Sequence, residues 1–445
     1  MRHPKFQPLA AGIAAALFLT APAQAATAQA LTAQTGHAGT PSSADWRAAW
    51  TAAAHHPFEG FGTPNWSVNG FANQSLRQVV RVSAGGSTVR VRLSNRFGDR
   101  PLKVTGATIA LAAGGAAVRP GSLRSLTFGR SRSATIPPGG ELTSDPAPLP
   151  TRALDSLAVT LYFAGPTGPA TVHENATATT YRTAGDRRFD PRAGAFAETS
   201  TSWYFLAGID TAGQPEHAHG VVVTFGDSIT DGYGTTVDAD NRYPDELAER
   251  LASGRRPVSV VNSGINGNKL LADSTCFGEA GVSRFGRDAL DQPGVRAVVV
   301  LEGINDIGGG GYPDFGCGAS PVVTAEQIID GHRQLIRAAH ARGVRIIGAT
   351  MLPMKDAFGY DTPANEAVRD AVNTWIRNGG EYDAVADLDR ALADPADRDA
   401  LRPTYDSGDH LHPNDAGAAA IAAVITPLLI HTAVEHHDIP PRSPS

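Results

Sequence analysis

A serine, a histidine and an aspartate in this sequence have the residue types and positions that nucleophilic catalysis requires. Ser228 follows an apolar run, at a predicted turn from a strand into a helix. Its hydroxyl is a weak nucleophile that needs a base. His412 is a candidate base, because Asp409, three residues before it, can curl back within a short loop, accept the Nδ1–H bond and support the imidazolium. The sequence therefore predicts a Ser228–His412–Asp409 triad.

Each residue of this predicted triad also has a simpler interpretation. Ser228 and the preceding Asp227 are residue types that cap helix N-termini. A histidine in a polar loop is often only a solvated side chain. His410 is a rival to His412 as the base, but it is adjacent to Asp409 and poorly placed for the bond that would close the loop. The segment around Ser228 alone does not decide between a nucleophile and a helix cap.

Two further segments offer hydrogen-bond donors for the negative oxygen of a tetrahedral acyl intermediate, which such a triad needs. Segment 262–268 (NSGINGN) contains glycines, and a glycine lets a backbone N–H approach the reacting carbon closely. Segment 303–306 (GIND) carries Asn305, whose side-chain amide can point inward. Taken separately, each segment could instead be a simple turn.

Apolar runs that alternate with helical stretches place these segments at strand ends. The runs are 221–225, 258–261, 297–301, 344–349 and 384–387. The clearest helix is 324–342, with apolar residues along one face and Gly343 as its C-terminal stop. Such a pattern is typical of a parallel sheet covered on both faces. We therefore predict a flavodoxin-like three-layer α/β/α domain at 218–431, with its chemistry at the carboxyl ends of the strands.

The preceding part of the chain, 45–211, has a different pattern. Run 89–93 alternates apolar and polar residues with period two, and run 157–163 is rich in β-branched and aromatic residues. Glycine and proline turn signals separate such runs. Short strands without helical periodicity predict an antiparallel, jelly-roll-like β-sandwich. A polar link at 214–219 joins the two predicted domains.

Together these segments resemble those of the SGNH (GDSL-type) hydrolases, a family of esterases and lipases. The blocks GDSIT, NSGINGN, GIND and DHLH occur in the family's order, each after a predicted strand or before the last helix. The resemblance covers about 218–431, roughly half the chain, and leaves the sandwich outside it. It implies that Ser228 is the nucleophile and, through its backbone N–H, one oxyanion donor. Gly267 would be the second donor, with Gly264 as its rival, and the side chain of Asn305 the third.

The same resemblance assigns the remaining polar residues. His412 would act first as general base and then as general acid, with Asp409 orienting it. Asp227 and Asp306 are expected to brace the loops rather than to react. Glu302 departs from the family pattern, because many members have a small residue there, and this departure puts the shape of its loop in doubt.

The N-terminus has the features of a secretory signal peptide. Arg2 and Lys5 precede an apolar stretch and a small-residue cleavage site at 23–25. The apolar stretch is too short to span a membrane. We therefore expect a signal peptide at 1–25, a flexible leader at 26–44 and a secreted or periplasmic mature protein.

The composition is that of a soluble globular protein, with 42% hydrophobic and 18% charged residues. Loss of residues 1–25 would change the net charge from −6 to −8. No basic stripe is present, which argues against a nucleic-acid partner. The segment 432–445 has three prolines and no apolar period, and we expect a loose tail there.

The two cysteines, Cys276 and Cys317, are expected to form a disulfide in an oxidising compartment. The bridge would bracket Asn305 and thereby hold the loop that carries a donor. Closing this loop of about 41 residues is worth about 4 kcal/mol by chain entropy. The alternative is a pair of buried thiols.

Histidines elsewhere in the chain give no sign of a metal site. His173-Glu174 lacks the second histidine of HExxH, and no Cys/His cluster has zinc spacing. His55-His56 and His436-His437 are expected on solvated surface. We therefore expect neither a metal nor another cofactor.

These features predict a secreted ester hydrolase that cleaves acyl esters, for instance acetyl groups on carbohydrate. One alternative is a lipase or lysophospholipase of the same family. Another is a catalytically inactive carbohydrate-binding or adhesion protein. The GxSxG elbow of α/β-hydrolases is absent from the chain.

Overall fold

The computed structural model describes most of the chain between residues 46 and 430. The described ranges are 46–60, 65–213, 220–254, 257–311 and 316–430. The expected signal peptide, leader and tail lie outside the described residues, as do the link at 214–219 and His436-His437.

A five-stranded parallel sheet forms the centre of the C-terminal part of the chain. Its strands are β16 (Val221–Gly226), β17 (Ser259–Gly264), β18 (Val295–Leu301), β19 (Arg345–Ala349) and β20 (Ala384–Ala386). They lie in the order β17-β16-β18-β19-β20, which is the flavodoxin-like order. All five observed strands overlap the predicted runs, and the predicted α/β fold is confirmed.

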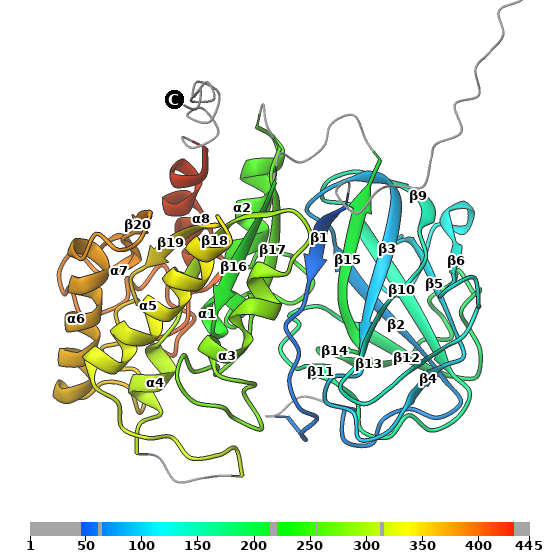
Figure 1. The fold of residues 1–445 in the computed structure, drawn as a ribbon, viewed down its shortest axis with the longest axis horizontal. Helices are drawn as coiled ribbons and strands as arrows, with labels where there is room; N and C mark the ends of the chain where they lie inside the picture. Colours follow the sequence, from blue (N-terminus) through cyan, green and yellow to red (C-terminus); the bar gives the residue numbers. More distant parts are fainter. Residues whose placement is uncertain (1–45, 61–64, 214–219, 255–256, 312–315, 431–445) are drawn as a thin grey trace, which may run out of the picture. The chain divides into compact units, whose positions relative to one another are not determined.

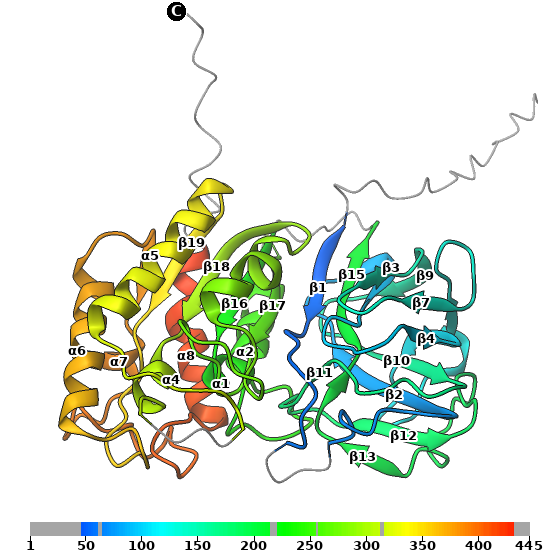
Figure 2. The ribbon, with the colours of Figure 1, turned by 60° about the horizontal axis from the view of Figure 1, so that its bottom comes forward.

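Helices cover both faces of this sheet (Figures 1 and 2). They are α1 (Ser228–Asp231), α2 (Tyr243–Ala252), α3 (Gly281–Phe285), η3 (Gly286–Leu290), α4 (Ile304–Gly308), α5 (Ala325–Ala341), α6 (Pro363–Asn378), α7 (Leu388–Leu392) and α8 (Asp415–Ile430). Helices α3, α5 and α6 share one apolar cluster with the sheet, and α2, α7 and α8 share the other. Among the described residues, no helix has the length and apolarity needed to cross a membrane.

Helix α5 shows how local signals set an element's ends. Thr324 caps its N-terminus, and the Thr324 and Gln327 side chains form a reciprocal capping box. At the other end Gly343 adopts a φ of +63°, which favours glycine. The predicted helix 324–342 therefore differs from the observed one by a single residue at each end.

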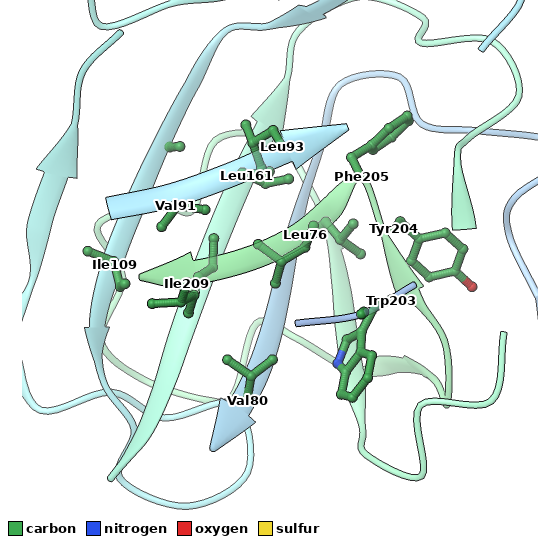
Figure 3. Close-up of a cluster of buried hydrophobic side chains, with 14 of the residues drawn as sticks. Leu76, Val80, Val91, Leu93, Ile109, Leu161, Trp203, Tyr204, Phe205 and Ile209 are labelled. Carbon is green, nitrogen blue, oxygen red and sulfur yellow. The ribbon is translucent and has the colours of Figure 1, made fainter. Parts of the chain in front are cut away.

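The N-terminal part is a β-sandwich of two antiparallel sheets, as predicted. One sheet contains β1 (Arg47–Thr51), β15 (Leu206–Ala212), β3 (Gly86–Ser94), β8 (Glu141–Thr143) and β9 (Ala147–Thr151). The other contains β13 (Glu198–Ser200), β12 (Thr180–Ala184), β2 (Gln74–Arg81), β10 (Ser156–Phe163), β5 (Gly106–Leu111) and β6 (Arg124–Leu126). Two short pairs complete it: β4 (Leu102–Val104) with β7 (Ala134–Ile136), and β11 (Val172–His173) with β14 (Trp203–Tyr204). Apolar side chains from both sheets, such as Leu93 and Leu161, fill the core (Figure 3).

The sandwich is bonded directly to the edge strand of the parallel sheet. Ala48 of β1 belongs to the apolar cluster of the α/β domain, and its carbonyl accepts a 2.6 Å hydrogen bond from Ser259 Oγ. Ser83 Oγ lies 2.8 Å from the same Ser259 oxygen, and Thr51 donates to the carbonyl of Asn262 at 2.8 Å. The two parts therefore share buried apolar surface and buried hydrogen bonds.

One expectation for the sandwich is wrong. His55 was expected on solvated surface, but it is only 2% exposed, and its Nε2 accepts a 3.1 Å hydrogen bond from the backbone N–H of Glu174. Burial lowers the pKa of His55 to about 3, so the ring is neutral. Its neighbour His56 is exposed, as expected. The pattern of residues gave no sign of this difference, because burial of His55 comes from tertiary packing.

The expected disulfide between Cys276 and Cys317 is present. Ser274 Oγ also donates to the carbonyl of Cys317 at 2.7 Å, and Thr275 N donates to the same carbonyl at 3.1 Å. The segment that precedes α3 is thereby held to the chain that follows α4.

A buried arginine joins the carboxyl ends of β16 and β17. Arg284 is fully buried, and its guanidinium donates to the carbonyls of Gly226 (2.8 Å) and Ser263 (2.7 Å) and to the side chain of Asn268 (2.8 Å). It also lies over the ring of Phe225, 4.0 Å from the centroid. One side chain thus satisfies polar groups of three segments.

Three buried carboxyl groups surround this end of the sheet. Burial raises the pKa of Asp227 to about 7 and that of Asp306 to about 6. Burial and the neighbouring carboxyl of Asp227 raise the pKa of Glu302 well above its usual range. Glu302 has no hydrogen-bond partner for either carboxyl oxygen among the described residues. Burial therefore shifts all three groups toward their neutral forms.

Replacing the buried arginine should destabilise the fold strongly. Arg284→Met removes one buried donor each from the carbonyls of Gly226 and Ser263 and from the side chain of Asn268, so the free energy of unfolding should fall by about 3–5 kcal/mol in urea titrations. Arg342→Met is the control, because Arg342 pairs with Asp291 on the surface, and it should cost no more than about 1 kcal/mol. Equal losses in the two variants would contradict the assigned role of Arg284.

The buried carboxyl groups predict that stability falls as pH rises. Between their unfolded pKa of about 4 and folded values near 6 and 7, the native state binds more protons than the unfolded chain. The contribution of these carboxyl groups to the free energy of unfolding should therefore decrease from pH 5 to pH 8. Asp227→Asn, which cannot ionise, should flatten this decrease by on the order of 1–4 kcal/mol. Urea unfolding at both pH values checks this, and an unchanged slope in the variant would refute it.

Candidate active site

Ser228 is the first residue of α1, directly after β16. Strand β16 has β17 on one side and β18 on the other, which is the switch point where ligands bind in such sheets. Asp227 caps the helix, because its Oδ1 accepts a 3.0 Å hydrogen bond from the N–H of Ile229. The cap role that the sequence allowed for this segment thus belongs to Asp227, which leaves the hydroxyl of Ser228 free for another partner.

That partner is His412. Ser228 Oγ lies 2.8 Å from His412 Nε2, and His412 Nδ1 lies 2.6 Å from Asp409 Oδ2. Asp409 Oδ1 also accepts hydrogen bonds from the backbone N–H groups of His412 (2.8 Å) and Leu411 (3.0 Å). The structure therefore brings the three predicted triad residues together in the expected order.

The electrostatics of this loop keep the carboxylate of Asp409 ionised. Partial burial would raise its pKa, but the hydrogen bonds from His412 and the nearby imidazole lower it well below the usual range. The side chain of Asp409 is 41% exposed, whereas that of His412 is 13% exposed. An ionised Asp409 stabilises a positive charge on the His412 ring.

The rival histidine faces away from this arrangement. His410 adopts a φ of +65°, and its Nδ1 lies 2.7 Å from Asp406 Oδ2. The two histidines of the segment are thus held by different carboxylates. The ring that contacts Ser228 is that of His412.

The two candidate glycines after β17 have different roles. The N–H of Gly264 donates to Asn262 Oδ1 at 2.8 Å, and a Cβ on Gly264 would come within 2.3 Å of the backbone N of Asp231. Gly267 has a φ of +73°, and a Cβ there would come within 2.4 Å of the ring of Phe277. Among the residues that the structure describes, the N–H of Gly267 has no hydrogen-bond partner. It is therefore the available donor.

Asn305 lies in the first turn of α4 and is held at both ends of its amide. Its Nδ2 donates to the carbonyl of Asn268 at 2.9 Å, and its Oδ1 accepts a 2.6 Å hydrogen bond from the hydroxyl of Tyr360. The carbonyl of Asn268 can only accept, so this contact fixes which end of the amide is nitrogen. One amide N–H remains available to a ligand.

Residues that the sequence analysis did not single out hold these loops. Asn268 donates to the carbonyls of Phe277 (2.7 Å) and Glu279 (3.0 Å) and accepts from Arg284. Tyr360 orients Asn305. No local pattern marks these residues, because each acts across more than eight positions of sequence.

Asp306 braces a loop, as expected. Its two oxygens accept from the N–H groups of Leu270 (2.7 Å) and Leu271 (2.9 Å). The loop that contains Glu302 takes a left-handed turn at Gly303, with φ of +111°. Within the described part of the chain, no group of three or more His, Cys, Asp or Glu residues is arranged to hold a metal ion.

An exposed aromatic ring lies beside the histidine. The ring of Tyr233 is 4.5 Å from that of His412, centroid to centroid, and 43% of Tyr233 is exposed. The arrangement as a whole can activate a hydroxyl through an imidazole and can offer N–H donors to an anionic oxygen. These are the requirements of acyl transfer through a serine.

The match to a known protein family agrees with this chemistry. Residues 224–420 match the family model of the GDSL-like lipases/acylhydrolases. No curated protein matches the chain. Solved structures that match include the lipase/acylhydrolase from Enterococcus faecalis, with 20% identity over 48% of this chain and 96% of that one and a TM-score of 0.37. Another is an acetylxylan esterase from Geobacillus stearothermophilus, with 19% identity over 48% and 94% and a TM-score of 0.36.

The family match spans the segments that carry Ser228, Gly267, Asn305 and His412, and it begins after the last strand of the sandwich. Residues 224–420 are a GDSL-like lipase/acylhydrolase domain, which identifies the protein as a hydrolase.

Proposed function

We propose that this protein is an exported serine esterase whose catalytic triad is Ser228, His412 and Asp409. The observation that carries the proposal is the relay of short contacts from Ser228 Oγ to His412 Nε2 (2.8 Å) and from His412 Nδ1 to Asp409 (2.6 Å). Export is supported by the composition of residues 1–25 and by the Cys276–Cys317 bridge, since such bridges persist in oxidising compartments.

In the first half of the reaction, Ser228 Oγ attacks the carbonyl carbon of the ester while His412 Nε2 takes the hydroxyl proton. The carbonyl oxygen becomes an anion, which the N–H groups of Ser228 and Gly267 and the free amide N–H of Asn305 stabilise. The imidazolium of His412 then protonates the leaving alcohol as its bond to the acyl carbon breaks. An acyl-Ser228 ester remains.

In the second half, water takes the place of the alcohol. His412 removes a proton from the water, and the hydroxide formed attacks the acyl carbon through the same kind of anionic intermediate. The bond to Ser228 Oγ breaks, and the proton on His412 returns to the serine. Asp409 stays ionised throughout and stabilises the imidazolium in both halves.

For the substrate we propose short acyl esters, such as acetyl, on a carbohydrate alcohol. His412 protonates the leaving alcohol, so that alcohol must lie beside His412 and therefore beside the exposed ring of Tyr233. Such a ring offers a flat apolar face with a polar hydroxyl at its edge, which suits a cyclic, hydroxyl-rich alcohol. The additional β-sandwich is compatible with polymer-bound substrates, an analogy at the level of the fold.

Ser228→Ala tests the nucleophile. It should lower kcat/KM on p-nitrophenyl acetate by at least about 1,000-fold with an unchanged Tm, because no other hydroxyl takes the place of Ser228. A serine-directed phosphonate should label the wild type at Ser228 alone. Ser253→Ala, at the exposed end of α2, is the control and should retain the wild-type rate. A Ser228→Ala protein with near wild-type activity would end the proposal.

An acyl-chain series tests the substrate class. We expect the highest kcat/KM with acetyl esters, a decline beyond butyryl, and release of acetate from an acetylated oligosaccharide. Tyr233→Ala should lower kcat/KM on the sugar acetate by about 10-fold and leave ethyl acetate unaffected, because only the sugar reaches the ring. A preference for long acyl chains would instead identify a lipase, and equal effects on both acetates would exclude a role for Tyr233 in binding the sugar.

A further inference from the structure

A buried ion pair joins the β-sandwich to the helix that begins with Ser228. His173, at the end of β11, lies with its Nε2 2.9 Å from Oδ1 of Asp231, the last residue of α1. Both side chains are 5% exposed or less. The two atoms form an ion pair when the ring is protonated.

The surroundings of His173 favour its charged form. Its Nδ1 lies 2.7 Å from the carbonyl of Ala53, an acceptor, so Nδ1 must carry a proton. Its Nε2 faces a carboxylate. Burial would lower the pKa of His173, but the charge of Asp231 and these contacts raise it above the usual value. The ring also stacks on Trp203, with 5.2 Å between centroids, which fixes its orientation.

Asp231 also contacts the loop that carries Gly267, the proposed oxyanion donor. Its second oxygen, Oδ2, accepts a 2.8 Å hydrogen bond from the backbone N–H of Asn266, the residue before Gly267. The carbonyl of Asp231 and that of Thr230 also face the side-chain amide of Asn262, at 3.4 and 2.8 Å. A carboxylate held by His173 thus sets the position of the peptide next to the donor.

The sandwich also reaches the other side of that loop. Arg96, between β3 and β4, pairs with Glu279 at 3.0 Å. The backbone carbonyl of Glu279 in turn accepts from Asn268, the residue after Gly267. Gly267 therefore lies between Asn266 and Asn268. Asn266 is bonded to Asp231 and Asn268 to Glu279, and each of these two acidic residues contacts the sandwich. The side chains of this second pair are partly exposed, 33% for Arg96 and 27% for Glu279, so the pair is the weaker of the two.

We infer that His173 is a positioning residue of the esterase site, acting through Asp231 and Asn266 on the N–H of Gly267. The inference rests on the proposed function, since it assigns a role toward the oxyanion donor proposed there. Donors stabilise an oxyanion only when they are preorganised, and a displacement of about 1 Å can cost as much as 100-fold in rate. The β-sandwich thereby forms part of the catalytic machinery rather than an appended module.

A double-mutant cycle tests this role in the full chain. His173→Phe keeps a ring on Trp203 but removes the contact, and Asp231→Ala removes it from the other side. Each should lower kcat on p-nitrophenyl acetate by about 10- to 100-fold, with KM within about threefold of wild type. A boronic acid, which forms a tetrahedral adduct on the serine, should bind more weakly by the same factor. In the Asp231→Ala background, His173→Phe should have no further effect.

The double variant also guards against misfolding, because it leaves no unpaired partner of this ion pair in the interior. Ser83→Ala is the matched control, since it loses a buried contact between the sandwich and β17 but touches no residue of the loop. It should keep the wild-type kcat. If the folded double variant has the kcat of Ser83→Ala, or if the two single effects multiply, the inference is wrong. An active Ser228→Ala would instead refute the proposed function itself.

Discussion

The site depends on one buried cation at the carboxyl end of the parallel sheet. Strands β16 and β17 end side by side, and the carbonyls of Gly226 and Ser263 at these ends accept from groups outside the strands; the N–H of Ile265 supplies one bond to Gly226 at 3.1 Å. An unpaired buried carbonyl is costly, so such ends need a donor. Arg284 supplies three N–H groups in one rigid plane, two for these carbonyls and one for Asn268. The turn into Ser228 and the loop with Gly267 both start from the ends that it fixes.

The charge of Arg284 also explains how so many carboxyl groups can lie near the nucleophile. If Asp227, Glu302 and Asp306 were all ionised, three negative charges would lie close together, with Arg284 acting on Asp227 and Glu302 and Lys269 acting on Asp306. Their raised pKa values show that burial resolves this excess by favouring protons on these groups. The environment of Asp409 differs from that of these three carboxyl groups. Asp409 lies on a half-exposed loop, its carboxylate accepts several N–H bonds, and its pKa is lowered. The environment, rather than the residue type, therefore separates bracing carboxyls from the carboxylate that supports the imidazolium.

The sequence could predict features that depend on local patterns of residues or on the order of motifs along the chain. Apolar periodicity and caps placed the helix at 324–342 within one residue, and the order of the four segments indicated the family. The resemblance favoured Gly267 over Gly264 as the donor, but the local pattern could not give the reason, which lies in the contacts of Gly264 with Asn262 and α1. Arg284 and His55 were missed for a related reason. Arginine is usually found at the surface and histidine is intermediate, and the burial of both residues here is decided by distant segments.

The position of His173 shows why a domain boundary predicted from the sequence pattern can mislead about function. Burying an imidazolium and a carboxylate together removes both from water, and such a pair persists only when further contacts hold each partner. Here the carbonyl of Ala53 and the ring of Trp203 hold the histidine, while the N–H of Asn266 holds the carboxylate of Asp231. The contacts that satisfy this pair come from the sandwich on one side and from the catalytic loops on the other. The change of sequence pattern near residue 214 therefore marks a change from β-sandwich to α/β structure. The residues that position the active site come from both sides of that boundary.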